Sequence, residues 1–382
     1  MNATSNSPVR VSIAVRAWNE EQVIRRALES LFQQSLFAEL SRRNECCEVL
    51  CIPNGCTDRT AEVAEAVFAE QRQSHPHAGA FRCRVENMIE AGRNNTWNAY
   101  VHQFADRGAE FVFLMDADIV FDRETTLFKM YEALLNNPEA HVASDRAVKE
   151  IAFKKKKTLR DRLSLATSDM TGTITAQICG QLYGIRSEIA RRIWMPKDLG
   201  APDDGFIKAL VCTDFFTREL NPRRVIMPEN ASHVFNAYTS VAEMLNNQKR
   251  QMAGQATVHI LIEYVKQLPL AERINPAPVI RYNEENDPQW MRRRLDAHLR
   301  EARFFWQLFP NALSYRIRRW WRMSGLKRLT HFPAAAAGFA VTLMACARAY
   351  YHFKHGQVHY WPKASRPEIE LARSSGSATA QS

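Results

Sequence analysis

Short apolar runs alternate with amphipathic stretches along the first third of the chain. The apolar runs predict strands at residues 9–18, 48–54, 81–88 and 111–118. The amphipathic stretches predict helices at residues 20–34, 58–73, 93–106 and 124–136. Strands and helices that alternate at these lengths are typical of an α/β fold, in which helices cover both faces of a mostly parallel sheet. Ligands bind such sheets beyond the carboxyl ends of the strands, so the residues that follow each strand are the first candidates for chemistry.

The middle of the chain continues with a different rhythm. A strand is expected to open at Gly180, followed by two helices, a strand-like stretch at 224–235 and a long helix at 240–267. These elements supply further loops over the same sheet edge. We therefore expect one fused domain at residues 9–267, made of a first half at 9–145 and a second half at 146–267.

The last part of the chain differs in composition, and we expect a helical region at 268–366 between that domain and a flexible tail at 367–382. A short flexible N-terminus is expected at 1–8. Arginine mixes with tryptophan and phenylalanine at helical spacing, as in WMRRRLDAHLREARFFWQLF from Trp290. Basic amphipathic helices of this kind favour an anionic membrane surface. The alternative is that they pack on the preceding domain and leave their arginines in water.

Residues 332–347 are sixteen residues without a charge. A helix that spans a bilayer needs about 20 apolar residues, and this stretch is short and rich in alanine. An interfacial or core-packing helix is therefore favoured over a membrane span.

Composition indicates the cellular environment of the protein but does not identify its binding partner. Lysine and arginine number 51 against 41 aspartates and glutamates, which fits phosphate-bearing ligands, nucleic acid or an anionic membrane face. None of the eight cysteines forms a Cys-x-x-Cys pair, which favours reduced thiols over a zinc site or a redox dithiol. The polar N-terminus lacks an apolar secretory segment. We expect a cytoplasmic protein, either free or peripheral on the cytoplasmic face of the membrane.

The fourth predicted strand ends in two aspartates, Asp116 and Asp118. Side chains alternate along a strand, so both carboxylates lie on one face. Two like charges this close repel one another unless a cation lies near them, and a hard divalent ion with oxygen ligands, Mg²⁺ or Mn²⁺, is the usual answer. Taken alone, Asp-x-Asp is a weak signal that more often marks a solvated turn.

Four motifs at the predicted strand ends add the context. In chain order they are Asn19-Glu20-Glu21, Gly55-Cys56-Thr57-Asp58-Arg59-Thr60, Gly92-Arg93-Asn94-Asn95-Thr96-Trp97-Asn98 and Asp116-Ala117-Asp118. In this order and spacing the sequence resembles the family 2 glycosyltransferases, which have the GT-A fold. The resemblance covers about residues 9–255. It implies an enzyme that moves a sugar from a nucleotide-diphospho-sugar to an acceptor hydroxyl, with help from a divalent cation and with inversion.

The resemblance assigns donor-side roles residue by residue. It implies that Ala17, Asn19, Glu20 and Asn54 line the nucleoside, and Arg93 is a candidate for phosphate contact. Asp118 is expected to contact the cation most directly, with Asp116 near the ribose or bridging through water. His233 resembles the C-terminal histidine that some GT-A enzymes use as a further metal ligand, although a lone histidine on a strand is more often a core or surface residue.

The residue expected to bind the base of the nucleotide departs from the family pattern. Family members often hold the uracil ring with an aspartate, and that position falls at Pro53, which offers no acceptor to a base. Asn54 could still bond the base. A UDP-sugar is the first expectation, and a GDP-sugar remains the alternative.

The acceptor side is implied by the second half of the chain. Gly180 and Gln181 begin the acceptor-side strand, and Asp203-Asp204 stands where the family has its Glu-Asp pair. In inverting members the second acid takes the acceptor's proton, so the resemblance implies that Asp204 is the general base, with Asp203 beside it. The plainer interpretation of this pair is a helix N-cap and first-turn acid, and both can hold together.

One motif of the family is largely missing. Its Gln-x-x-Arg-Trp pattern falls at 247–251, where only Arg250 is retained, and this departure weakens any prediction of a processive polymer synthase. A lipid-linked, small-molecule or glycan acceptor, with a cell-envelope glycan as product, is what the resemblance and the basic C-terminal helices favour. Nucleic acid is not expected as a partner.

Rival functions remain open. A nucleotidyltransferase would need a glycine-rich phosphate loop after the first strand, and RAWNEE at 16–21 contains no glycine. A noncatalytic, membrane-associated or polyanion-binding protein with a degenerate GT-A fold would explain the basic C-terminal region but not the four motifs with Asp203-Asp204. A retaining transferase that uses a GDP-sugar is the third alternative.

Overall fold

The structure is a computed structural model that describes residues 7–154, 176–200, 203–236, 241–310, 312–330 and 332–355. Of the ends predicted to be flexible, only residues 7 and 8 fall within this range, and the tail at 367–382 lies outside it. The helical region predicted at 268–366 is described as far as residue 355.

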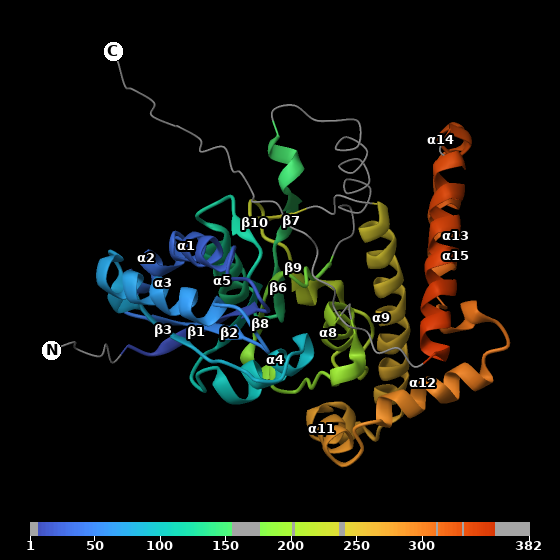
Figure 1. Cartoon of the computed structure of the whole chain (residues 1–382), viewed down its shortest axis with the longest axis horizontal. Helices are drawn as coiled ribbons and strands as arrows, with labels where there is room; N and C mark the ends of the chain where they lie inside the picture. The colour runs from blue at the N-terminus through green and yellow to red at the C-terminus, as the bar shows by residue number, and fades with distance from the viewer. Residues whose placement is uncertain are drawn as a thin grey trace.

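The centre of the molecule is a seven-stranded sheet in the order β3-β2-β1-β4-β8-β6-β9 (Figure 1). Its strands are β1 (Val9–Ala17), β2 (Cys46–Pro53), β3 (Phe81–Val85), β4 (Phe111–Asp116), β6 (Val142–Ser144), β8 (Leu182–Arg186) and β9 (Val225–Ile226). All neighbours pair in parallel except β8, which runs antiparallel to β4 and to β6. The predicted mostly parallel α/β sheet is confirmed.

Helices cover both faces of the sheet because its inner strands bury side chains on both. One face carries α1 (Ile24–Phe32), α2 (Leu36–Arg42), α3 (Thr60–Ser74) and α5 (Thr126–Asn136). The other carries α4 (Arg93–Ala99), α7 (Ser187–Ala190), α8 (Asp203–Cys212) and part of α9 (Val241–Gln267). Along β4 the side chains alternate between the two clusters, with Phe113 on the first face and Leu114 on the second.

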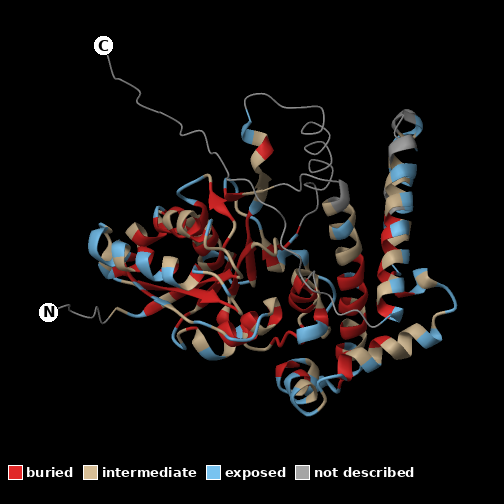
Figure 2. Cartoon of the chain, in the orientation of Figure 1, coloured by how far each residue is buried: buried red, intermediate tan, exposed pale blue. Residues whose placement is uncertain are grey.

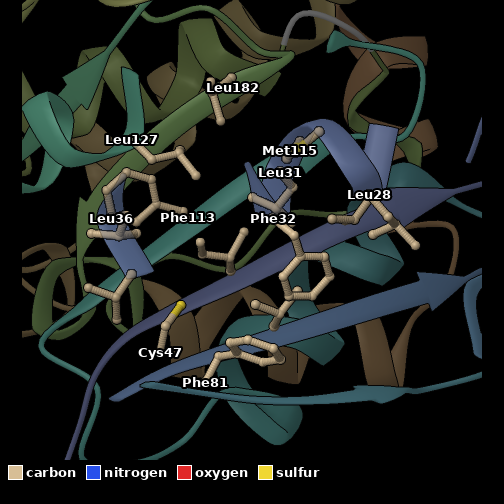
Figure 3. Close-up of a cluster of buried hydrophobic side chains, with 14 of the residues drawn as sticks. Leu28, Leu31, Phe32, Leu36, Cys47, Phe81, Phe113, Met115, Leu127 and Leu182 are labelled. Carbon is tan, nitrogen blue, oxygen red and sulfur yellow. The ribbon is translucent and has the colours of Figure 1, made fainter. Parts of the chain in front are cut away.

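The apolar cluster on the first face joins helices to strands that are distant in sequence. Figure 3 shows Leu28 and Leu31 of α1 in one cluster with Phe113 of β4 and Phe81 of β3, and all four are buried. Burying one such side chain contributes about 1.5–3 kcal/mol relative to leaving it in water. This burial fixes the strand order and hence which strand ends meet at the site.

A few local elements differ from the sequence-based expectation. The helix predicted at 93–106 is α4 followed by a π-helical turn, Tyr100–Phe104, and α2 is an additional helix. Short 3₁₀ turns occur at Ala78–Ala80, Glu150–Phe153, Lys197–Leu199, Pro222–Arg224 and Phe305–Leu308.

The strand-like stretch predicted at 224–235 divides between two sheets. Its start is β9 of the large sheet, and its end is β10 (Ser232–Phe235), the centre of a small sheet ordered β5-β10-β7. The other two strands are β5 (Val120–Phe121) and β7 (Arg146–Lys149). Since β5 directly follows the two aspartates, the antiparallel pairing of His233 with Phe121 brings β10 to the end of β4.

The C-terminal region is helical, as predicted. It consists of α10 (Leu270–Arg273), α11 (Ala277–Asn286), α12 (Trp290–Glu301), α13 (Ala312–Trp321), α14 (Gly325–Thr330) and α15 (Phe332–Lys354). α15 lies beside α9, with Cys346 and Phe353 in a cluster that also holds Ala253 and Ile260 (Figure 1). None of the helices in the described residues combines the length and the apolar character that crossing a membrane requires.

Candidate active site

The first two charged residues of the site come from neighbouring strands. Arg16 is the second-last residue of the buried strand β1, and its partner in register is Asp116, the last residue of β4. The Nη2 of Arg16 donates to Asp116 Oδ1 at 2.8 Å, and only 6% of Arg16 is exposed. A buried arginine needs such a partner because an unpaired charge in the interior is costly.

A second arginine, Arg93, begins α4 and reaches the same carboxylate. Its Nη1 lies 3.1 Å from Asp116 Oδ2, its Nε lies 3.1 Å from Asp203 Oδ2, and its Nη2 donates to the carbonyl oxygen of Gly180 at 2.5 Å. Burial would lower the pKa of Arg93, but Asp116 and Asp203 raise it well above its usual value. One guanidinium therefore joins the end of β4, the segment before β8 and the start of α8.

The carboxylate of Asp116 stays ionised in this setting. Burial alone would raise the pKa of Asp116, but Arg93 and Arg16 together lower it. Asp116 is thus held as an anion by two arginines that come from two different elements.

The two acids at the start of α8 have different surroundings. Asp203 is 2% exposed and is paired with Arg93, and Arg16 Nη1 lies 3.8 Å from it. Burial and the neighbouring charge of Asp203 raise the pKa of Asp204 to about 6. The backbone N–H of Gly205 donates to Asp204 Oδ1 at 2.8 Å. Of the two acids, Asp204 is the one whose pKa lies close enough to neutral pH for its carboxylate to accept a proton there.

His233 lies fully buried at the edge where β10 meets the end of β4. Its Nδ1 lies 2.7 Å from Asp145 Oδ2, and its Nε2 lies 3.4 Å from Gln181 Oε1. Burial would lower the pKa of His233, but Asp145, followed by Asp118 and Asp116, raises it. The histidine therefore lies within the electrostatic reach of both aspartates that follow β4.

The described residues contain one group of three side chains whose possible ligand atoms lie within 4.8 Å of one another: Asp145, Cys179 and His233. Asp116 and Asp118 stand outside that group. Burial, followed by Asp145, raises the pKa of the Cys179 thiol above its ordinary value, so the sulfur is protonated in the absence of a cation.

Comparison with known proteins bears directly on this site. Residues 12–194 match the family model described as glycosyl transferase family 2. These residues include Arg16, Arg93, Asp116, Asp118 and Asp145. The chain carries a family 2 glycosyltransferase domain. No protein of the curated set matches the chain.

Several solved structures are similar to the glycosyltransferase at low identity. One is glucosyl-3-phosphoglycerate synthase from Mycobacterium tuberculosis in complex with Mn²⁺, uridine diphosphate and glucosyl-3-phosphoglycerate, at 14% identity and a TM-score of 0.43, covering 65% of this chain and 80% of that one. Another is S. aureus TarS 1–349, at 15% identity and a TM-score of 0.42, covering 91% of this chain and 92% of that one. A mycobacterial protein is 19% identical, with a TM-score of 0.42, over 65% of this chain and 74% of that one.

At the predicted nucleoside end of the glycosyltransferase, Asn54 makes hydrogen bonds to two other segments of the chain. The carbonyl oxygen of Ala17 accepts from the backbone N–H of Asn54 at 2.9 Å and from its Nδ2 at 2.7 Å. Asn54 Oδ1 accepts from the N–H of Gly92 at 3.1 Å. Asn54 thus ties β1 to the loop before α4, and its role toward a base stays a prediction.

The Asn19-Glu20 pair forms the adjoining turn. Asn19 adopts a positive φ of 53°, and its Oδ1 accepts from the N–H of Thr57 at 2.7 Å. The N–H of Glu20 donates to Thr60 Oγ1 at 2.7 Å. These contacts lock the first and second motifs of the sequence together across the ends of β1 and β2.

The acceptor-side residues are placed in two regions. Gln181 accepts from the N–H of Asp116 through its carbonyl oxygen at 2.8 Å, so it borders the aspartates. Arg250 lies on α9 and donates to Asn247 Oδ1 at 2.7 Å. The roles of both toward an acceptor stay predictions.

Sequence reasoning missed Cys179 and two charged residues of this site, Arg16 and Asp145. Both charged residues lie at the carboxyl end of a buried apolar strand, β1 and β6 respectively. A charge in that position is a usable signal, because it must find a partner that the fold brings to it.

Proposed function

We propose that this protein transfers a sugar from a nucleotide-diphospho-sugar, with UDP as the first expectation and GDP as the alternative, to an acceptor hydroxyl by single displacement with inversion. Asp204 accepts the proton of the acceptor hydroxyl as its oxygen bonds to the anomeric carbon. The bond from that carbon to the diphosphate breaks, and its electron pair leaves with the nucleoside diphosphate. A retaining outcome would require a different base geometry and is the alternative.

The observation that carries this proposal is the contrast within the Asp203-Asp204 pair. Asp203 is neutralised by Arg93, whereas burial and Asp203 raise the pKa of Asp204 to about 6. A base is most effective when its pKa lies near the working pH and it is held within reach of its proton donor. A helix N-terminal acid with a purely structural role would not need such a pKa.

We infer that a divalent cation binds at this edge. Asp118 and Asp116 offer carboxylate oxygens, and His233, whose pKa responds to both, offers a ring nitrogen. We propose that these three residues hold Mg²⁺ or Mn²⁺. Such an ion, when bound, offsets the negative charge that grows on the leaving diphosphate.

Arg93 is the group suited to phosphate. It already holds two carboxylates and one carbonyl oxygen with its three nitrogens. A guanidinium binds phosphate oxygens with the same forked geometry that it uses for carboxylates. We propose that the donor diphosphate shares this arginine with Asp116 when it binds.

The acceptor is proposed from the C-terminal helices. Several large apolar side chains on α13 to α15 are exposed in the described residues, and they include Ile317, Trp321, Leu329 and Phe332. Arg318 and Arg322, which are also exposed, lie among them. Arginine and tryptophan together favour an anionic bilayer surface. We propose that these helices rest on a membrane and that the acceptor is lipid-linked, for a cell-envelope glycan.

The decisive experiment measures release of nucleoside diphosphate by the purified full chain with Mn²⁺ and a panel of UDP- and GDP-sugars. We expect Asp204→Asn to reduce turnover by at least about a hundredfold, the size of a general-base contribution, while Mn²⁺-dependent nucleotide binding persists. The matched control is Asp198→Asn, a solvent-exposed acid six positions earlier in the chain. Full turnover in Asp204→Asn would refute the assignment of the base.

A further inference from the structure

A buried aspartate stands directly behind His233. Asp145 follows β6, is 1% exposed, and has its Oδ2 2.7 Å from Nδ1 of the fully buried histidine. The other oxygen of Asp145, Oδ1, is buried and has no hydrogen-bond partner among the described residues. Among the described residues, the side-chain carboxylate of Asp145 therefore makes its hydrogen bond to the ring of His233.

The opposite side of the ring faces the end of β4. His233 Nε2 lies 3.4 Å from Gln181 Oε1, and Gln181 accepts the backbone N–H of Asp116 at 2.8 Å through its carbonyl oxygen. β10 also pairs with β5, which directly follows Asp118. The ring thus has a carboxylate beside Nδ1, and beside Nε2 it has the side chain of Gln181, a residue whose backbone carbonyl oxygen accepts from Asp116.

A neutral imidazole carries one N–H and one lone pair, and only the lone pair can bind a cation. Asp145 accepts a hydrogen bond from the Nδ1–H of the ring, so the proton stays on Nδ1 and the lone pair is on Nε2. Without Asp145, the remaining acceptor beside the ring is Gln181 Oε1, which would draw the proton to Nε2 and turn the lone pair away from the cation.

We propose that Asp145 is a positioning residue that keeps the proton of His233 on Nδ1 and so presents Nε2 to the divalent cation. This inference rests on the proposed function, in which His233 is a ligand of that cation. A cation bound at Nε2 would displace the Nε2 proton of a doubly protonated ring to solvent, and the hydrogen bond from Nδ1–H to Asp145 would remain. Carboxylates that orient ligand histidines in this way are common around metal ions.

The test uses the full chain, with Mn²⁺ as the probe and free Mn²⁺ measured by electron paramagnetic resonance. The variants are Asp145→Asn, Asp145→Glu and His233→Ala. The control is Asp122→Asn, which loses a carboxylate that accepts from Ser232, the neighbour of His233, without touching the ring. We expect Asp145→Asn to bind Mn²⁺ about 10- to 100-fold more weakly, Asp145→Glu to recover part of that loss, and Asp122→Asn to bind as the wild type does.

A second readout does not depend on the metal. In the metal-free protein, recorded above the titration of the ring, nitrogen-15 spectra of His233 should show the proton on Nδ1 in the wild type and on Nε2 in Asp145→Asn. Melting temperatures of all variants show whether a loss of Mn²⁺ binding is only a loss of folding. An unchanged tautomer in a folded Asp145→Asn would overturn the inference.

The outcomes separate this inference from the proposed function. If His233→Ala weakens Mn²⁺ binding and Asp145→Asn does not, the positioning role alone is refuted. If His233→Ala binds Mn²⁺ normally, the proposed set of cation ligands fails, and the positioning role fails with it. The Co²⁺-loaded protein tests whether Cys179 is a ligand, through a thiolate-to-cobalt absorption band. If this band is present and is lost in Cys179→Ser, the cation binds to the group of Asp145, Cys179 and His233, and the inference is overturned.

Discussion

Arg93 holds three segments of the chain with one guanidinium: the end of β4 through Asp116, the start of α8 through Asp203, and the carbonyl oxygen of Gly180. Removing one partner from a buried set of charges leaves the others uncompensated, which is more harmful than never having had the set. The same residue therefore supports the fold and prepares the site.

We predict that Arg93→Met lowers the free energy of unfolding by about 3–5 kcal/mol, because Asp116 and Asp203 lose their shared cation. Arg93→Lys should recover only part of this loss, since one ammonium cannot reach three acceptors. Urea denaturation measures both. The control is Arg59→Met, in an ion pair whose arginine side chain is 76% exposed, where we expect a change below about 1 kcal/mol. A similar small change in Arg93→Met would contradict the proposed network.

The raised pKa of Asp204 leads to a prediction for the pH dependence of the reaction. Burial and Asp203 raise its pKa to about 6, so the carboxyl is neutral below that pH and cannot accept a proton. The value of kcat/KM should fall about tenfold per pH unit as the pH drops below the pKa, and level off above it. The profile of kcat/KM between about pH 5 and 8 measures this. A flat profile on the acidic side would contradict the role of Asp204 as base.

The sequence predicts the acidic residues proposed to bind the cation or the proton better than it predicts the residues that hold those acids in place. Asp116, Asp118, Asp203 and Asp204 stand out because paired acids at strand and helix ends are unusual. Arg16 does not, because its partner Asp116 is 100 positions away and is found only through the register of β1 and β4.

At the level of elements, most strands and helices of the first half follow from apolar periodicity. β1, β2, β3 and β4 lie where alternation and apolar runs predict them. The stretch at 224–235 is predicted less well, because β9 and β10 join different sheets and local pattern carries no information about pairing partners. That division brings His233 beside Gln181, and the sequence predicts this histidine as a site residue only through the family resemblance.

The C-terminal helices differ in how much of their surface is exposed. α15 packs on α9 through its second half, while α13 and α14 show mostly exposed and half-buried surface in the described residues (Figure 2). We predict that the double variant Trp321→Ala and Leu329→Ser, with side chains 58% and 74% exposed, weakens co-sedimentation with anionic phospholipid vesicles severalfold.

The matched control for the vesicle experiment is Leu220→Ser, a leucine that is 69% exposed and lies outside these helices. It should bind vesicles as the wild type does, and binding of all forms should weaken with added salt, because the attraction is partly electrostatic. Equal binding of the double variant and the wild type would show that the C-terminal helices are not the membrane surface.

Across the whole molecule, the apolar cluster on the α4 and α8 face of the sheet includes side chains from both sides of the boundary predicted at residue 267. Leu114 of β4, Phe206 of α8 and Leu261 of α9 share it with Trp290 and Ile280 from beyond residue 267. The C-terminal region therefore begins on the core of the transferase domain. The boundary predicted at 267 follows a change in composition, and packing continues across it because apolar side chains are buried irrespective of their place in the chain.

The site lies where an α/β sheet of this topology exposes its strand ends, and the central claim is that it binds a nucleoside diphosphate together with a divalent cation. The most direct test is the melting temperature of the purified full chain with UDP, GDP, CDP and dTDP, each with and without Mn²⁺. A ligand that binds only the folded state raises this temperature by mass action. We predict a rise with UDP that requires Mn²⁺ and that is lost in Asp118→Asn. No rise with any of the four nucleotides would contradict the account.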